Sequence, residues 1–444
     1  MSEAIPSGSR DATGLLRRFA PWPALARPVR DPRNDITMKI LILAQEISID
    51  QSGGSGRVVW EEARALARRG HTVAVGVPRA RHELATEEKR DEVTIFRYGN
   101  VKRRETMGRF IADILDTPRF VKQMLVGARW DAVIAHHPHV AYGALRVSGM
   151  RKPPFIYIFH ASAAAEMKYE GLSRPALNRF AAWFLKFFFV RGTALIERKV
   201  LRSARAVGVF SDFSGTLMRQ LYGWAVRKTT VTRLPMGVDT KRFYSTESRQ
   251  AVRERLGLDK DALIFVTVRR LVPRTGVRIL LDAFLIVRDR MGDNVQLIVV
   301  GEGREREALE RHAASIGLKK FVRFVGRSGD DDLPFWYQAA DASVVPTVAY
   351  EGFGISIIES MACGTPVIGT PVGAIPEILL AFDERLLADA PRPVALADRL
   401  VWFAEEGAHE EWMEPCRDFV KRWYSWDKHA EKVEELLEEI RSVK

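Results

Sequence analysis

MKILILAQE (38–46), SGGSGRVVWEEARALARRGH (52–71) and TVAVGVP (72–78) are the three consecutive segments that decide the fold. The first and third are short apolar runs typical of buried strands. The middle segment is a glycine turn followed by a helix that ends at Gly70. A strand, a helix and a second strand in this order predict two parallel strands covered by the helix between them.

This rhythm recurs in two blocks separated by the Pro/Gly segment LPMGVDTKRF (234–243). In the first block, further strands are predicted within 130–138, 154–162 and 204–212. In the second, they are predicted within 262–271, 295–303, 320–327, 342–347 and 365–370. We therefore predict an α/β chain of two doubly wound parallel-sheet units. The predicted divisions are a disordered extension (1–37), a first domain (38–245), a second domain (246–428) and a C-terminal helix (429–444).

Length and composition agree with a two-domain globular protein. The 444 residues exceed the roughly 250–300 at which a single core stops growing, and 47% of them are hydrophobic. Cys363 and Cys416 lie far apart, which is typical of a reducing cytosol rather than a disulfide framework. The longest apolar run, 180–190, contains Lys186 and is shorter than the ~20 residues of a membrane span. We expect a cytoplasmic protein.

The charge is unevenly distributed along the chain. Of the net +12, residues 1–245 carry +19 and the remainder carries −7. Two basic, aromatic-bearing stretches, 101–130 and 177–192, favour an anionic membrane surface as a partner on the inner face of the cell membrane. The alternatives are a solvated basic face and an aromatic helix packed in the core. Nucleic acid is not expected, because base-stacking aromatics are not interleaved along a basic groove.

The segment YEGFGISIIESMACGTPVIGTPVGAIPE (350–377) carries the chemistry. A helix is predicted to begin near Ser356, and backbone N–H groups at a helix start suit a phosphate. Carboxylates accept hydrogen bonds from sugar hydroxyls, so Glu351 in the loop and Glu359 in the helix can hold the two ends of one ligand. The alternative is that Glu351 caps the helix and Glu359 is a surface residue.

These landmarks resemble the retaining glycosyltransferases of family 4, which have the GT-B fold of two facing Rossmann-like domains with a cleft between them. The Glu-x7-Glu pair within EGFGISIIESMACGTPVI matches the signature of that family, and the resemblance extends from Met38 to the end of the chain. It implies that Glu351 contacts the transferred sugar and that Glu359 binds the ribose. It also implies that the backbone of Phe353, Gly354 and Ile355 faces the diphosphate, which Arg270 neutralises as it leaves.

In the first domain, the resemblance assigns His160 to the neighbourhood of the reacting sugar and His136 to the lining of the site. Gly53 and Gly54 either let the backbone approach the acceptor or the diphosphate, or form a plain turn. His136, His137 and His139 form a poor chelate, because adjacent residues on an extended segment point to opposite faces.

Two residues depart from the family pattern beside Arg270. Arg269 replaces the usual glycine, and Thr275 replaces a lysine that normally faces phosphate. Arg274 either supplies the missing charge or is a solvated turn residue.

We predict a hexosyltransferase that moves a sugar from a nucleotide-diphosphate sugar to an acceptor hydroxyl with retention, without a metal or a further cofactor. The predicted acceptor is a lipid-linked or cell-envelope glycan. The alternatives are a protein of the same fold that binds a nucleotide sugar without transferring it, and a nucleotide-sugar epimerase.

Overall fold

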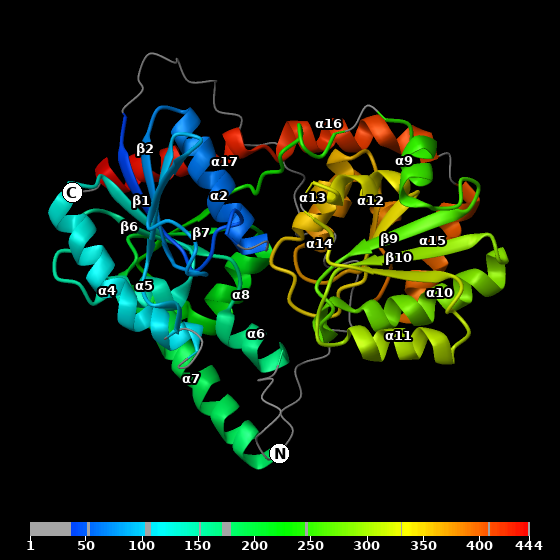
Figure 1. The fold of residues 1–444 in the computed structure, drawn as a ribbon, viewed down its shortest axis with the longest axis horizontal. Helices are drawn as coiled ribbons and strands as arrows, with labels where there is room; N and C mark the ends of the chain where they lie inside the picture. Colours follow the sequence, from blue (N-terminus) through cyan, green and yellow to red (C-terminus); the bar gives the residue numbers. More distant parts are fainter. Residues whose placement is uncertain are drawn as a thin grey trace.

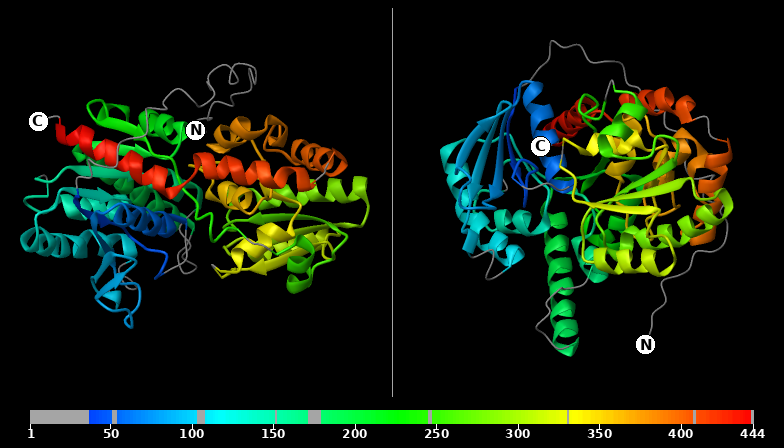
Figure 2. Two further views of the ribbon diagram at one scale, coloured as in Figure 1. Left: turned by 90° about the horizontal axis from the view of Figure 1, so that it is seen from above. Right: turned by 45° about the vertical axis from the view of Figure 1, so that its right-hand side comes forward.

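A computed structural model describes residues 37–50, 54–102, 108–150, 152–170, 179–244, 247–329, 331–406 and 409–442. The predicted extension, 1–37, lies outside these residues except for Thr37. The chain forms two α/β units that lie side by side, and its last helices run across both (Figures 1 and 2). The two predicted blocks of strands correspond to two separate sheets.

The first sheet has eight strands in the order β3-β4-β2-β1-β5-β6-β7-β8. All neighbouring strands are parallel except β3 and β4. The predicted strands are present, whereas β3, β4 and β8 were not predicted. The bounds are β1 (Lys39–Leu43), β2 (Thr72–Pro78), β3 (Glu87–Arg90), β4 (Val93–Tyr98), β5 (Ala132–Ala135), β6 (Phe155–Phe159), β7 (Ala206–Val209) and β8 (Thr230–Arg233).

Helices connect these strands and cover the sheet. Their starts and ends follow local sequence rules, as when the Ser211 hydroxyl caps α8 by accepting a hydrogen bond from the Ser214 N–H at 3.0 Å. The bounds are α2 (Gly54–Arg68), α4 (Arg109–Gly127), α5 (Pro138–Leu145), α6 (Ala163–Glu170), α7 (Arg179–Ser203), α8 (Asp212–Tyr222) and the short η2 (Gly223–Ala225).

The second sheet has the parallel order β11-β10-β9-β12-β13, so β9 lies at its centre. The chain adds β10 and β11 on one side of β9 and then β12 and β13 on the other. In such sheets, ligands bind at the carboxyl edge of the strands, at the point where the order reverses. The strands are β9 (Leu263–Val268), β10 (Val295–Val300), β11 (Val322–Gly326), β12 (Ala342–Val345) and β13 (Val367–Gly369). The helices are α9 (Arg249–Leu256), η3 (Pro273–Thr275), α10 (Val277–Met291), α11 (Arg306–Ser315), α12 (Leu333–Ala339), α13 (Ile355–Ala362), α14 (Ile375–Phe382), η4 (Glu384–Leu386), α15 (Pro393–Glu406), η5 (His409–Trp412) and α16 (Met413–Trp423).

The last helix returns to the first unit. It was predicted at 429–444, and it spans α17 (Trp426–Ser442) and packs on α2 (Figure 1). The segment that enters α17 lies against the segment that leaves β8, because the Val238 N–H donates to the Tyr424 carbonyl at 3.1 Å. A Cβ atom on Gly237 would lie 2.5 Å from the Trp426 nitrogen, so only glycine fits there.

Neither cysteine forms a disulfide, since Cys363 and Cys416 are free and buried. Within the part of the chain that the structure describes, we find no helix with both the length and the apolar character needed to cross a membrane.

Candidate active site

The loop that carries Glu351 connects β12 to α13, at the carboxyl edge of the second sheet. The predicted helix start is confirmed to within one residue, because α13 begins at Ile355 after Gly354 with φ 93°. Gly373, with φ 66°, packs against this loop, and a Cβ atom there would lie 2.3 Å from the Glu351 carbonyl oxygen. The same oxygen accepts a hydrogen bond from the Ala374 N–H at 3.0 Å. The segment GAIPE therefore fixes the backbone that presents Glu351.

The Glu351 carboxylate is paired with Arg269. Its Oε2 accepts hydrogen bonds from Arg269 Nη2 and, at 3.2 Å, from the Thr347 hydroxyl. Burial alone would raise the pKa of Glu351, but the adjacent Arg269 guanidinium holds it below its ordinary value. Arg269 Nη1 is also buried and has no hydrogen-bond partner among the described residues. This arginine was noted only as a departure from the family pattern, and its contact with Glu351 was not predicted.

Arg270, two residues after the end of β9, is exposed. Arg274 and Thr275, in contrast, are buried. The Thr275 hydroxyl donates to the Arg270 carbonyl at 2.8 Å and to the Val272 carbonyl at 2.7 Å, so it serves the local turn. Arg274 is 8% exposed, and the alternative of a solvated turn residue is therefore wrong. Its guanidinium donates to the Tyr350 carbonyl at 3.1 Å, directly beside the Glu351 loop.

Glu359 is buried in α13 and faces the first unit. It forms an ion pair with Arg57 of α2 and accepts a hydrogen bond from the Tyr337 hydroxyl at 3.2 Å. Burial raises the pKa of Glu359, and the Arg57 charge opposes that rise. The Glu359 side chain is 3% exposed, so the alternative of a surface glutamate is wrong. Arg57 lies within the quoted SGGSGR segment, yet nothing in the sequence indicated that it reaches across to the second unit.

His160 follows β6 and lies against the Glu351 loop. A Cβ atom on Gly352 would lie 2.6 Å from the His160 carbonyl oxygen. The Gly352 carbonyl in turn accepts hydrogen bonds from the hydroxyls of Ser211 at 2.6 Å and Ser214 at 2.9 Å, both in the first unit. The structure therefore brings the two predicted halves of the site, His160 and the Glu351 loop, into contact.

A second carboxylate joins the units beside this loop. Glu377, at the end of GAIPE, accepts hydrogen bonds from the N–H groups of Asp212 at 3.0 Å and Phe213 at 2.7 Å. These are N-terminal N–H groups of α8, which have no acceptor within the helix. A residue of the second unit thus caps a helix of the first, and this role was not predicted.

The remaining predicted residues line the same region. Phe353 is buried and packs edge-on against Tyr424, with ring centroids 5.7 Å apart. Phe353, Gly354 and Ile355 lead into α13, whose first N–H groups have no acceptor within the helix. Their contact with a diphosphate stays a prediction.

The glycine turn before α2 differs from the expectation. Gly53 lies outside the described residues, and a Cβ atom on Gly54 would meet nothing within 4 Å. The glycine that packing requires is Gly56, where a Cβ atom would lie 3.0 Å from the Ser48 nitrogen. Neither fact tests an approach of Gly53 or Gly54 to a substrate.

The three histidines after β5 have different partners, as expected of a poor chelate. His136 contacts His160 and Glu62, His137 Nδ1 accepts from the Gln45 N–H at 3.1 Å, and His139 Nε2 lies 3.3 Å from the Thr193 hydroxyl. Burial lowers the pKa of His137 well below its ordinary value and that of His139 to about 4. No group of three or more metal-ligating side chains comes together in the described ranges.

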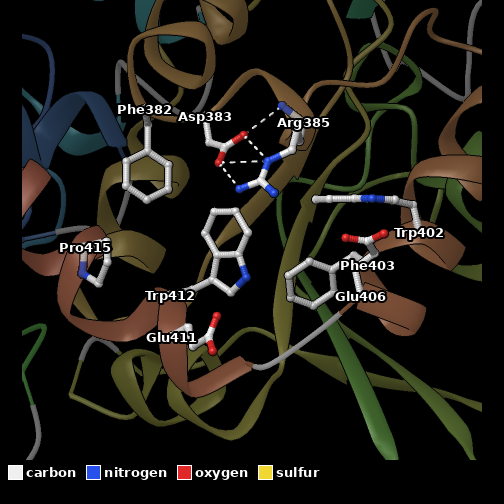
Figure 3. Close-up of a pocket in the computed structure, with 9 residues that line it drawn as sticks. All are labelled: Phe382, Asp383, Arg385, Trp402, Phe403, Glu406, Glu411, Trp412 and Pro415. Atoms are coloured by element: carbon white, nitrogen blue, oxygen red, sulfur yellow. Dashed lines mark hydrogen bonds and ion pairs between the residues drawn. The ribbon is translucent and has the colours of Figure 1, made fainter.

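A separate pocket of about 390 Å³ lies in the second unit, on elements that carry none of the predicted residues (Figure 3). Aromatic rings and the Arg385–Asp383 ion pair, at 2.7 Å, line it. It is formed by η4, η5 and the adjoining helices, so we place the candidate site at the contact between the units and not here. The lining residues are Phe382, Asp383, Arg385, Trp402, Phe403, Glu406, Glu411, Trp412 and Pro415.

Two family models match the chain, one to each unit. Residues 52–242 match the model described as Glycosyltransferase Family 4. Residues 248–426 match the model described as Glycosyl transferases group 1. The candidate residues fall within these two ranges.

Curated relatives include D-inositol 3-phosphate glycosyltransferases. The protein of Streptomyces scabiei is 32% identical over 47% of this chain and 48% of its own length. The protein of Acidothermus cellulolyticus is 25% identical over 96% of this chain and 93% of its own length. The chain spans about half the length of the Streptomyces relatives that it matches.

Solved structures with the same fold include a sucrose-phosphate synthase from Thermosynechococcus elongatus. It aligns with a TM-score of 0.73 and 22% identity over 91% of this chain and all of its own. Anabaena HepE in complex with UDP and glucose aligns with a TM-score of 0.67 and 18% identity over 90% of this chain and all of its own. The architecture of two facing Rossmann-like units is therefore shared with these proteins.

Proposed function

Because the chain belongs to the family 4 glycosyltransferases of the GT-B fold, we propose that it transfers a sugar from a nucleotide-diphosphate sugar to an acceptor hydroxyl with retention of anomeric configuration. The observation that carries this proposal is the contact between the Glu351 loop of the second unit and His160 of the first. It brings the loop that carries Glu351 against the backbone of His160, so that segments of the two facing units meet where we place the donor sugar and the acceptor.

We assign the donor to the carboxyl edge of the second sheet. Glu359 suits the ribose hydroxyls, because a carboxylate accepts two hydrogen bonds. Arg57, which is paired with Glu359 in this structure, must move away from that carboxylate or share it when a donor binds. Glu351, kept ionised by Arg269, suits the hydroxyls of the transferred sugar.

The leaving diphosphate needs positive charge or N–H donors where its charge develops. Arg270 and Arg274 lie on the segment after β9, and Arg274 donates to the Tyr350 carbonyl. The N–H groups of Ile355 and Ser356, at the start of α13, have no acceptor within that helix. Arg274, which is held beside the Glu351 loop, is our candidate for the role of the lysine that Thr275 replaces. In a retaining transfer the diphosphate leaves from one face of the sugar, and the acceptor oxygen attacks that same face. The proton of the acceptor hydroxyl passes to the departing phosphate oxygen.

We further propose that transfer needs no metal ion, because arginines and helix N–H groups supply the positive field at the diphosphate. Turnover measured in excess EDTA tests this. Activity that persists supports the proposal, and activity that is lost and then restored by a divalent cation contradicts it.

The first unit suggests where the acceptor resides. On α7, Phe187 is 45% exposed, Phe188 55% and Leu195 61%, so the alternative of a wholly buried aromatic helix is wrong. The Arg191 guanidinium lies 5.3 Å from the centre of the Phe187 ring, and α7 extends away from the body of the first unit (Figures 1 and 2). Exposed apolar side chains beside cations suit an anionic lipid surface.

We therefore propose attachment to the inner face of the cell membrane and a lipid-linked or envelope-glycan acceptor. Liposome flotation with neutral and with anionic vesicles tests the attachment. The Phe187→Ser/Phe188→Ser variant should lose flotation with anionic vesicles, whereas Val394→Ser, which changes an exposed apolar residue of the second unit, should not. Equal flotation on neutral and anionic vesicles contradicts the proposal.

The experiment that tests the central proposal is a panel of nucleotide sugars. Each is screened by thermal shift, since a ligand at 100 times its dissociation constant stabilises the folded state by about 2.7 kcal/mol. Release of the nucleoside diphosphate in the presence of membrane extract then reports transfer, and NMR of the product reports its anomeric configuration. Glu351→Gln should abolish release, whereas Glu307→Gln, at an exposed position of α11, should not. Inversion of configuration contradicts retention.

One observation favours binding without transfer as a second candidate function. The Thr275 hydroxyl is committed to two backbone carbonyls, so that position supplies neither a cation nor a free donor to phosphate. Donor binding without release of nucleoside diphosphate, with any acceptor fraction, supports this candidate and contradicts transfer.

A further inference from the structure

A buried row of hydrogen-bonded side chains connects His160 to the C-terminal helix. His160 Nε2 lies 3.0 Å from His136 Nδ1, and His136 Nε2 lies 3.0 Å from Glu62 Oε1. Glu62 Oε2 lies 2.7 Å from His429 Nε2, and His429 Nδ1 lies 2.8 Å from the Pro235 carbonyl oxygen. The side chains of Glu62, His136 and His429 are fully buried. The row joins β6, β5, α2 and α17, which are far apart in the sequence.

The acceptors in this row determine where its protons lie. A backbone carbonyl only accepts, so His429 Nδ1 carries a proton. Burial raises the pKa of Glu62, but the positive charge carried by the flanking pair of histidines and the hydrogen bonds from both rings hold it far below its ordinary value. The ionised carboxylate also only accepts, so His429 Nε2 and His136 Nε2 carry protons as well. His429 is then an imidazolium that balances the charge of Glu62.

With that charge balanced, a second buried cation would have no counter-ion, and His136 is therefore neutral. Its Nε2 holds its single proton, so its Nδ1 accepts a hydrogen bond from His160 Nε2–H. Burial, followed by the proximity of His136, lowers the pKa of His160 to about 3, so this ring is neutral near pH 7. A neutral His160 with a proton on Nε2 has a lone pair on Nδ1, for which the described residues provide no partner.

We propose that His429 is a positioning residue that acts through Glu62 and His136 to fix His160 as the Nε2–H tautomer, so that Nδ1 accepts a hydrogen bond from a hydroxyl of the bound sugar or acceptor. The orientation of the His160 ring is held by its neighbours as well. His137 stacks on it with centroids 5.6 Å apart and an interplanar angle of 16°, and Phe210 meets it edge-on at 5.0 Å. The function of the tautomer rests on the proposed transfer reaction.

The contact between α17 and the first unit contains a second buried histidine, His71, which serves as a matched control. His71 Nε2 lies 2.9 Å from Glu434 of α17, and His71 Nδ1 accepts from the Met38 N–H at 3.2 Å. This contact also fastens α17 to the first unit, but it leads to no predicted site residue. Replacing His71 by leucine therefore removes a comparable buried pair without touching the row that ends at His160.

The test measures the tautomer directly, without a substrate. The full chain is labelled with ¹⁵N in the rings of its nine histidines, and long-range ¹H–¹⁵N correlation spectra are recorded near pH 7, with His160 assigned from the spectrum of His160→Asn. The wild-type protein and His71→Leu should both show His160 protonated on Nε2. In His429→Leu, the imidazolium that balances Glu62 is absent, so His136 takes up a proton from solvent and its Nδ1 then donates a hydrogen bond. His160 should consequently switch to the Nδ1–H tautomer.

Kinetics with an active nucleotide sugar give a second readout. Losing one hydrogen bond to the reacting sugar, at a cost of about 1.4 kcal/mol, corresponds to a tenfold change in rate. His429→Leu should therefore lower kcat at least tenfold with KM for the donor within twofold, while His71→Leu leaves both within twofold. An Nδ1–H tautomer of His160 in the wild-type protein overturns the inference even if no variant folds. An unchanged tautomer in folded His429→Leu overturns it too. If no nucleotide sugar is turned over, the proposed function is contradicted, whereas the result on the His160 tautomer still stands.

Discussion

Replacing Arg269 by methionine removes the guanidinium that binds Glu351 while keeping an unbranched side chain in place of the aliphatic part of the arginine. The Arg269 side chain is 7% exposed and that of Glu351 14%, so the pair is shielded from water. Removing one partner of a buried ion pair leaves an uncompensated charge and costs about 3–5 kcal/mol. A loss of 1 kcal/mol lowers Tm by roughly 2–4 °C in a domain of 150–250 residues. The thermal transition of the second unit should therefore fall by roughly 6–20 °C near pH 8.

The loss of Tm in Arg269→Met should depend on pH, and the pKa of Glu351 determines the direction of that dependence. In the wild-type protein the pKa of Glu351 is below its ordinary value. The pair thus contributes stability above the pKa of the unfolded chain and loses it as the pH falls through the folded pKa. Without Arg269, burial dominates and raises the pKa of Glu351, so the carboxyl takes up a proton on mild acidification. The difference in Tm between Arg269→Met and wild type should therefore be smaller at pH 5.5 than at pH 8.

Differential scanning calorimetry at the two pH values measures both effects. Arg290→Met is the matched control, because Arg290 forms a 2.7 Å ion pair with Asp398 in which the side chains are 47% and 56% exposed. Such surface pairs contribute about 0–1 kcal/mol. The double variant Arg269→Met/Glu351→Gln should regain most of the lost Tm, since no unpaired charge remains. Equal shifts for the two arginine variants, or a deficit that grows on acidification, would refute the reasoning.

Two further predictions concern the contact between the units, and a third concerns the Glu351 loop. Arg57→Gln, which breaks the pair with Glu359, should increase the radius of gyration of the ligand-free protein in small-angle scattering. Arg68→Gln, at an exposed pair, should not, and equal radii for both would contradict the prediction. Glu377→Ala removes the acceptor for the first N–H groups of α8 and should cost about 0.5–2 kcal/mol, the usual effect of losing a helix cap; an unchanged Tm of the first unit would count against it. Gly373→Ala places a Cβ atom against Glu351 at φ 66° and should weaken nucleotide-sugar binding in calorimetric titration, whereas Gly292→Ala, which has a positive φ but open space, should lower stability without changing affinity.

The strands of both sheets could be predicted because each is a short, nearly continuous apolar run, as buried parallel strands are. Two of the three exceptions, β3 and β8, have identifiable causes. β3 is the polar sequence EEKR, with mostly exposed residues, and it pairs antiparallel with β4 through Asp91 and Glu92, whose φ angles are 48° and 64°. An edge strand of this kind has no apolar signal, and such φ angles are uncommon outside glycine. β8 is half-buried throughout and likewise has no apolar run.

The candidate site was predictable where one segment carries it. Glu351, Glu359 and Gly354 lie within nine residues, and their placement in the loop and at the helix that follows was predicted from that segment. The partners of these residues were not predictable, because they come from distant elements. Arg57 reaches Glu359 across the two units, and Arg269 binds Glu351 from the end of another strand. The first pairing, across 302 positions, depends on how the two units are placed against one another, and the second, across 82 positions, depends on the order of the strands in the second sheet.

The return of α17 to the first unit means that the polypeptide passes between the units twice. The two passages touch, since Val238 is bonded to Tyr424 and Gly237 packs against Trp426. Two adjacent connecting segments allow the units to rotate about one axis but restrict twisting and sliding between them. If the units open to release a product, we therefore expect the Glu351 loop to return to His160 in the same alignment.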